Sequence, residues 1–317
     1  MRPIFTLLLL CVLPVSATTY VRAEPERLTR KEKAKPEYWL PRIVKGCERG
    51  NLLSCVKAGR AAEDGSHQQF LPQQAEYYYG KACAGGYQDG CSFLVGRKLW
   101  LNTISGKPYT ESDMEWAELG KELRRYCDQG NGVGCFYLAG FTTGSPDERK
   151  TMRYNFYVRS CDLGEPMGCH QAAVEMPASE GVDDPKQIDE WIRLLHRGCR
   201  LGKLSDCEWL GNTYRLAAFK RRDLVLARRY LKHACKKEWF GACSSFGEMY
   251  RDGEGVDKDF ARALALFEKS CPHGESYGCY EAGVMYRDGL GTPVNRVKAD
   301  DFFKRCEDWD SRCRDAH

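Results

Sequence analysis

The chain has 317 residues, with 48 Lys and Arg against 44 Asp and Glu, which gives a formal net charge of +4. So small an excess of positive charge does not predict a nucleic-acid-binding protein. The 17 cysteines instead favour a disulfide-rich protein of an oxidising compartment.

Residues 1–23 have the pattern of a secretory signal peptide. Arg2 is followed by the apolar run Ile4–Val15 and then by small residues, so cleavage is expected after Ala17 or Ala23. The apolar run is too short to span a bilayer, and no other run is long enough. We therefore expect an exported protein, periplasmic or secreted, with no transmembrane segment.

Cysteine pairs recur along the rest of the chain. Seven pairs have members eight positions apart, and the first cysteines of these pairs are 36, 44, 34, 38, 36 and 36 residues apart. Such a period is typical of repeat proteins. An eighth pair is one residue shorter, and only Cys11, in the expected signal peptide, is left over. The pairs are Cys47/Cys55, Cys83/Cys91, Cys127/Cys135, Cys161/Cys169, Cys199/Cys207, Cys235/Cys243, Cys271/Cys279 and Cys306/Cys313.

The spacing within each pair predicts a turn. Residues eight apart on a straight helix would be about 12 Å apart, whereas a disulfide needs Cα atoms within roughly 7 Å. Glycines such as Gly130, Gly164 and Gly202 fall between the paired cysteines, as helix ends require. We interpret each pair as a disulfide that joins the end of one helix to the start of the next. The alternative is that the cysteines are buried free thiols.

Each unit therefore predicts two helices. The first begins near the second cysteine of a pair and ends at glycine, as in Cys243–Gly253, and the second ends at the next pair. Small residues three to five positions after the second cysteine mark expected close helix contacts: Ala58, Gly59, Gly96, Ala139, Gly211, Gly247 and Gly283. Proline is expected in the first turn of second helices at Pro72, Pro146, Pro185 and Pro293, with Ser145, Asp184 and Thr292 as N-caps. The 44-residue interval carries an insertion around 101–108.

The pattern Cys-x-x-x-Gly-x-x-Tyr-x-x-Gly-x-Gly, complete in Cys243–Gly255 and Cys279–Gly291, resembles the SLR-type (Sel1-like) repeat. The added cysteines resemble its secreted branch, the Helicobacter cysteine-rich protein family. The resemblance covers about 47–306 and is weaker at Cys169, where the tyrosine is missing. It implies an all-α, TPR-like α/α solenoid of about seven disulfide-stapled helix pairs, with a concave and a convex face.

Three segments follow from these patterns: a signal peptide at 1–23, a charged tether at 24–36 and a single repeat solenoid at 37–317. The expected function is that of a repeat scaffold that binds a protein or peptide on its concave face. The family resemblance implies two alternatives. One is binding or hydrolysis of β-lactams or cell-wall peptides, and the other is assembly of cytochrome c oxidase in the mitochondrial intermembrane space. The signal peptide argues against mitochondrial import.

Catalytic candidates are few. Ser54 and Lys57 match the Ser-x-x-Lys element of a serine β-lactamase, but nothing matches its two companion elements. Ser54 also stands at an ordinary repeat position beside a cysteine, so the match is expected to arise by chance. The histidines lie in different units without metal-binding spacing, and we expect no metal and no cofactor.

One segment is strongly basic. Arg221, Arg228 and Lys232 would share a face if they lay on one helix, and Arg229 adjoins them. This cluster predicts either a docking patch for an anionic envelope component or, more simply, a solvated outer helix face.

Overall fold

The computed structural model describes residues 36–63, 73–104, 114–176, 184–216 and 221–316. Within these ranges all regular structure is helical, which confirms the all-α prediction. Helices of one set end near the first cysteine of a pair: α1 (Pro36–Glu48), α3 (Gln73–Ala84), α5 (Met114–Asp128), α7 (Pro146–Asp162), α9 (Pro185–Arg200), α11 (Leu224–Lys236), α13 (Phe260–Ser270) and α15 (Arg296–Lys304). The alternating set is α2 (Leu52–Glu63), α4 (Gln88–Ile104), α6 (Gly132–Leu138), α8 (Pro166–Glu175), α10 (Leu204–Arg215), α12 (Phe240–Asp252) and α14 (Ser276–Asp288). Short helices η2 (Ala139–Phe141), η4 (Cys271–His273) and α16 (Ser311–Arg314) complete the described part.

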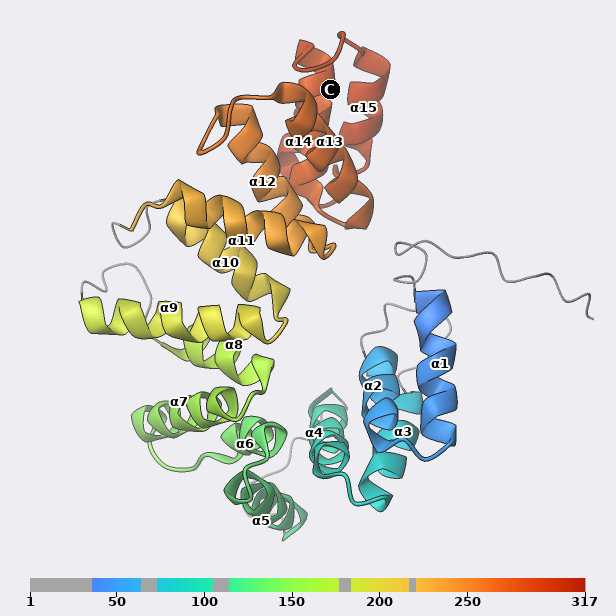
Figure 1. Cartoon of the computed structure of the whole chain (residues 1–317), viewed down its shortest axis with the longest axis vertical. Coiled ribbons are helices and arrows are strands. Elements are labelled where there is room, and N and C mark those ends of the chain that lie inside the picture. Colours follow the sequence, from blue (N-terminus) through green and yellow to red (C-terminus); the bar gives the residue numbers. More distant parts are fainter. Residues whose placement is uncertain (1–35, 64–72, 105–113, 177–183, 217–220, 317) are drawn as a thin grey trace, which may run out of the picture.

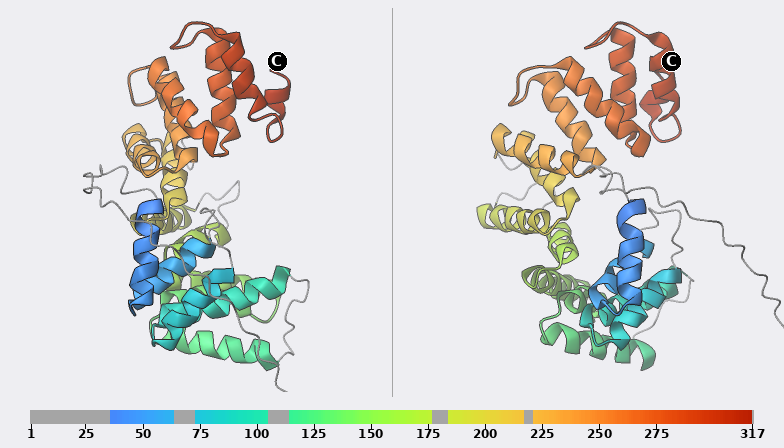
Figure 2. Two further views of the ribbon diagram at one scale, coloured as in Figure 1. Left: turned by 90° about the vertical axis from the view of Figure 1, so that its right-hand side faces the viewer. Right: turned by 45° about the vertical axis from the view of Figure 1, so that its right-hand side comes forward.

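The helices stack into a curved superhelix (Figure 1). From α2 to α10 the even-numbered helices lie on the inner side of the curve, and their odd-numbered neighbours lie outside. The turned views show the same succession of helix pairs climbing from α4 and α5 to α15 (Figure 2). Each pair packs mainly on its neighbours in sequence, as expected for a solenoid.

All eight expected cysteine pairs form disulfides in the structure. In the seven pairs of separation 8, Cα–Cα distances run from 4.4 to 4.8 Å, and the distance in the eighth pair is 5.9 Å. The bonds are Cys47–Cys55, Cys83–Cys91, Cys127–Cys135, Cys161–Cys169, Cys199–Cys207, Cys235–Cys243, Cys271–Cys279 and Cys306–Cys313.

The turn inside a pair is a helix-ending motif. In the Cys83–Cys91 turn, Gly86 has φ of +85°, its N–H donates to the Cys83 carbonyl, and the Tyr87 N–H donates to the Ala82 carbonyl. A residue in the left-handed region lets the chain reverse within four residues and bring the next helix to the cysteine.

The second cysteines lie deeper in the inner helices than the sequence predicted, as Cys55 and Cys207 show. Helices were expected to begin near these cysteines, but Cys55 lies about one turn inside α2 and Cys207 about one turn inside α10. The α2 start is earlier because the Asn51 side chain accepts from the Ser54 N–H at 2.9 Å, as an N-cap does. Both cysteines have 0% exposure. The helices thus begin near these cysteines, three residues earlier, and both cysteines are core positions where the disulfide packs as apolar volume.

Small residues set the distance between the helices of a unit. A Cβ on Gly59 would lie 2.4 Å from the Tyr79 ring, and one on Gly283 would lie 2.4 Å from the Phe303 ring. Tyr79 and Phe303 are almost fully buried, so each glycine makes room for a large core residue of the following helix. The expectation of close approach at Gly59 and Gly283 is therefore confirmed.

A repeated hydrogen bond joins successive outer helices. A basic residue two positions before a first cysteine donates to the carbonyl of the preceding unit's first cysteine. Arg159 reaches the Cys127 carbonyl at 3.1 Å, and Arg197 reaches that of Cys161 at 3.0 Å. Each bond adds a side-chain donor to a helix-end carbonyl that already accepts from the turn glycine, Gly130 for Cys127 and Gly164 for Cys161.

The starts of the outer helices agree with the sequence in two cases and differ in one. Ser145 and Asp184 are N-caps, with Pro146 and Pro185 in the first turn. The prediction at Thr292 and Pro293 is wrong, because α15 begins at Arg296 after Asn295, whose side chain accepts from the Lys298 N–H.

Several expectations lie outside the described residues. These are the signal peptide at 1–23, most of the tether at 24–36, Pro72 and part of the insertion at 101–108. No helix in the described ranges has the length and apolar character that crossing a membrane requires.

Candidate functional site: a pocket on the inner face

A hollow of about 190 Å³, partly open to solvent, lies where four inner helices meet. We call it the inner-face pocket. It draws residues from α2, α4, α6 and the start of α8, and therefore spans units far apart in the sequence. Its lining residues are Arg60, Glu63, Phe93, Val133, Phe136, Tyr137, Glu165 and Met167.

Arg60 enters the pocket from α2. Its guanidinium lies over the Phe93 ring, 5.2 Å from the ring centre, which is a cation–π geometry. Its Nη2 is 3.9 Å from the Glu165 carboxylate, too far for a hydrogen bond. The Arg60 side chain is 45% exposed. Arg60 is thus held by an aromatic face and by an ion pair at long range.

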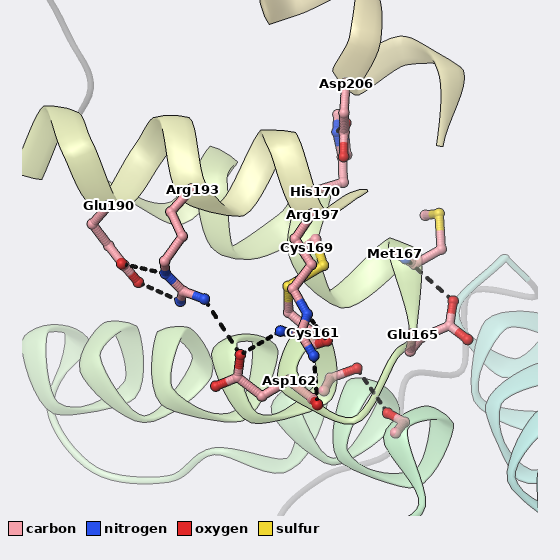
Figure 3. Close-up of a disulfide and its surroundings, with 12 residues drawn as sticks. Cys161, Asp162, Glu165, Met167, Cys169, His170, Glu190, Arg193, Arg197 and Asp206 are labelled. Atoms are coloured by element: carbon pink, nitrogen blue, oxygen red, sulfur yellow. Dashed lines mark hydrogen bonds and ion pairs between the residues drawn. A yellow bond between two sulfur atoms is a disulfide. The ribbon is translucent and has the colours of Figure 1, made fainter. Parts of the chain in front are cut away.

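Glu165 forms the floor of the pocket at the start of α8, beside the Cys161–Cys169 disulfide (Figure 3). It is the N-cap residue, and its Oε1 accepts from the Met167 N–H at 3.2 Å. Only 8% of the residue is exposed. Burial raises the pKa of this carboxyl, and Arg60 and the Met167 N–H offset the shift only in part, while Asp89 adds to it. A buried carboxylate here is therefore incompletely compensated.

Glu63 stands on the α2 side of the pocket and is tied to its neighbours. Its Oε2 accepts from the Tyr79 hydroxyl at 2.7 Å, and its Oε1 is 3.7 Å from Arg97 Nη1. Arg97 is almost completely buried and also lies 3.6 Å from Glu76. This arrangement fixes the Glu63 carboxylate and leaves it 30% exposed toward the pocket.

Aromatic rings form much of the remaining wall. Phe93 is T-shaped to Tyr137, with ring centres 6.1 Å apart, and Phe136 lies against Tyr137 in the same way. Burial and the nearby carboxylates of Glu63 and Glu165 raise the pKa of Tyr137, so the phenol stays neutral. The ring fits because Gly96 stands behind it, where a Cβ would come within 2.2 Å. The pocket therefore combines apolar ring faces with carboxylates.

The structure does not bring Ser54 and Lys57 into this pocket. Ser54 is half-buried on α2, and its Oγ would be 2.8 Å from a Cβ on Gly46. Other units use the same position, one before the second cysteine, for a tight crossing of two helices, at Gly90, Gly134, Gly168 and Gly278. Ser54 thus occupies a packing position of the repeat, and Lys57 is exposed.

The basic cluster is on the outer layer, and one part of its prediction is wrong. Arg221 does not share a helix with Arg228 and Lys232, because Asp223 caps α11 and the helix begins at Leu224. Arg221 instead pairs with Asp189, at 2.6 Å. Arg228, Arg229 and Lys232 are exposed on α11, as either interpretation of the cluster requires.

A second polar contact joins α8 and α10. His170 Nδ1 is 2.6 Å from Oδ1 of Asp206, which is fully buried, and Asp206 Oδ2 has no hydrogen-bond partner. Burial raises the pKa of Asp206, and the bond with His170 opposes the shift. Asp206 fits because Gly198 faces it. In the described part of the chain no three His, Cys, Asp or Glu residues are grouped to hold a metal ion.

Sequence reasoning missed the inner-face pocket. One residue of the pocket stands out in the sequence. Four positions before the second cysteine, where other units have Asn51 and Asn131, this unit has the acidic residue Glu165, followed by Pro166. This signal gives no indication that Arg60 lies opposite. That contact depends on the rotation between successive units.

Helix pairs stapled by local disulfides and stacked into a superhelix define the class of the protein, an α/α solenoid. Residues 57–87, 242–274 and 276–305 match the family model of the Sel1 repeat, and the chain thus contains three Sel1 repeats.

Solved structures with this fold include a protective antigen of uropathogenic Escherichia coli with an SLR fold. It is 20% identical with a TM-score of 0.56, and the alignment covers 87% of this chain but only 58% of the antigen. A Sel1 repeat protein of Oxalobacter formigenes is 15% identical with a TM-score of 0.50, covering 87% and 88% of the two chains. Cysteine-rich protein B of Helicobacter pylori is 18% identical over 55% of this chain and 98% of its own, with a TM-score of 0.31. At such identities the first two likenesses show the fold alone. A comparison with curated proteins gives no match.

Proposed function

We propose that the protein is a non-enzymatic scaffold whose inner face binds a segment of a partner protein. The observation that carries this proposal is the inner-face pocket, which four consecutive inner helices build together. Concave pockets that combine apolar rings with a few polar groups are the usual binding sites of proteins. Solenoids offer such surfaces along their inner curve.

We further propose that the scaffold works outside the cytoplasm. Eight disulfides persist in oxidising compartments and are rare in reducing ones. The signal-peptide pattern at 1–23 supports export to the periplasm or beyond. The single solenoid at 37–317 would then be the mature, working part of the chain.

Site-specific photocrosslinking tests the inner face as the binding surface. A photoreactive phenylalanine analogue is placed at Met167 in the pocket, at exposed Glu118 on outer helix α5 as control, and at Lys232 in the basic cluster. The oxidised proteins are irradiated with the envelope and secreted fractions of the producing cells. We expect a defined crosslinked partner at Met167 and none at Glu118.

Crosslinking at Lys232 but not at Met167 would contradict the inner-face proposal and favour the basic cluster as the docking site. Equal crosslinking at Met167 and Glu118 would mean that no surface is specific. Either result would reject the proposed function.

A further inference from the structure

We propose that the inner-face pocket binds an arginine or lysine side chain of the partner, at a place that Arg60 fills in the free protein. This inference rests on the proposed function and specifies the chemistry that the partner must present. It is carried by the charge around the pocket, by its aromatic walls and by the way Arg60 is held.

Carboxylates outnumber cations at the pocket. Glu165 is more than nine-tenths buried and Glu63 also lines the pocket, while the negative charge of Asp89 further raises the pKa of Glu165. Arg97 faces Glu63 but also lies against Glu76. Arg60 is therefore left as the main counter-charge of Glu165, at 3.9 Å. An added cation would lower the cost of burying the Glu165 carboxylate, and an added anion would raise it.

The aromatic rings are of the kind that binds cations. Arg60 already shows that a guanidinium fits over the face of Phe93. Phe136 and Tyr137 line the same hollow, so a second cationic head would also lie among aromatic rings. Aromatic faces attract ammonium and guanidinium groups, and they do so more strongly away from water.

Arg60 is weakly fixed. Its distance to Glu165 exceeds hydrogen-bond length, and its side chain is 45% exposed. Arg97 is also beyond hydrogen-bond length from Glu63 and Glu76, at 3.7 and 3.6 Å, but its side chain is only 3% exposed and is therefore held by burial. A partner arginine whose guanidinium donates directly to Glu165 would form a charge-assisted hydrogen bond that Arg60 does not make. Arg60 would then swing out toward solvent.

The test measures binding of three short peptides to the oxidised full chain by NMR titration. The peptides are acetyl-Gly-Arg-Gly-amide, its lysine counterpart and its citrulline counterpart, which keeps the shape of arginine without the charge. We expect the arginine peptide to bind at least about tenfold more tightly than the citrulline peptide, as for other charge-assisted contacts. The lysine peptide should fall between them.

Two variants separate this proposal from a general role of the pocket. Glu165→Gln keeps an oxygen to cap the Met167 N–H but removes the charge, and should weaken arginine-peptide binding about tenfold. Arg60→Met keeps an apolar stem but removes the resident cation, and should strengthen binding severalfold. Glu118→Gln on α5 is the matched control and should change nothing.

Equal affinity for the arginine and citrulline peptides would overturn the inference, as would loss of arginine-peptide binding in Arg60→Met, which would mean that Arg60 supports the bound peptide instead of occupying its place. If these results came with a partner crosslinked at Met167, only the charge preference would fail and the inner-face scaffold would stand. If no crosslink formed at Met167 either, the proposed function would fail as well.

Discussion

The last two complete units and the region around α4 to α6 are built from the same repeat but differ in regularity. Between α12 and α15 the period is 36 residues, and both α12 and α14 end at a left-handed glycine, Gly253 and Gly289. One continuous core with Phe267 and Phe303 runs from α13 to α15. In the other region the interval widens to 44 residues. There α6 is only 7 residues long, and α4 packs on α6 more than on α5.

The difference shows where a repeat protein leaves room for a ligand. A regular stack buries its apolar faces between neighbours and closes over them. Where the stack is interrupted, Phe93, Phe136 and Tyr137 line an open hollow on the inner side. The candidate site therefore coincides with the departure from the repeat, and the regular units provide the support.

The largest effect is expected from the core of the regular region. Phe267→Ala should lower the free energy of unfolding by about 3–5 kcal/mol, because a fully buried ring is replaced by a cavity. Hydrogen exchange should show the loss of protection in α12 to α14 but not in α2 and α3, since each unit contacts only its neighbours. Val225→Ala, 66% exposed on α11, is the control. Uniform loss along the chain would contradict the comparison.

Removal of a single disulfide tests whether the disulfides contribute equally to the stability of the two regions. Replacing Cys235 and Cys243 by alanine, or Cys127 and Cys135, should cost about 2–3 kcal/mol in denaturant unfolding, because each pair closes a short loop of equal length. Only the second change should weaken arginine-peptide binding, because α6 carries Phe136 and Tyr137. Equal loss of binding in both variants would break the comparison.

The turn between α11 and α12, beside the regular region, contains one residue with an unfavourable backbone conformation. Glu238 has φ of +66° and is the single non-glycine residue with positive φ in the described part of the chain, at a turn position that is glycine in the six other units with an eight-residue pair. Glu238→Gly should stabilise the protein by about 1 kcal/mol, since glycine adopts this conformation without steric cost. Thermal unfolding measures the gain. Lys237→Gly, with φ of −92°, should not stabilise the protein.

The smallest effect is a dependence on pH. Burial raises the pKa of Glu165 above the ordinary value of 4.5, so the folded protein holds a proton that the unfolded chain has already released. Stability should therefore fall as pH rises from the ordinary pKa toward the raised one. Glu165→Gln should flatten this fall in urea unfolding between about pH 4.5 and 7.

The equivalent residue of the last unit, Glu275, sharpens this comparison. Burial also raises its pKa, with Glu208 as a second cause, but Glu275 is only half-buried. Glu275→Gln should flatten the profile less than Glu165→Gln does. If Glu275→Gln flattened the profile more, the charge of Glu165 would be better compensated by its neighbours than the contacts around it indicate.

Local features of the fold were predictable from the sequence. The eight-residue spacing required a turn between paired cysteines, and the structure has one at each pair. Positions such as Gly59 and Gly283 predicted close helix contacts because a small residue recurs at a fixed distance from cysteine. These features depend on residues within one or two helices, where chain geometry allows few alternatives. The helix starts before Cys55 and Cys207 were placed about one turn too late, because the capping residue rather than the cysteine decides where a helix begins.

The site was not predictable in the same way. Arg60 and Glu165 belong to different units, and their approach depends on small rotations that accumulate over α3 to α7. An insertion within that stretch changes the rotation by an amount that no local pattern records. Asp206 is a similar case, because its buried carboxylate depends on His170 from the preceding inner helix and on the space left by Gly198.

The eight disulfides have a consequence for how the chain matures. Each joins cysteines only 7 or 8 residues apart, so no bond waits for a distant segment to arrive. If the chain crosses a membrane with its N-terminus first, the first cysteine of a pair reaches the oxidising side only 7 or 8 residues before its partner. Closure of short loops is fast compared with disulfide formation. In an exported chain, oxidation could therefore follow translocation one disulfide at a time, with the nearest free cysteine as the correct partner at each step.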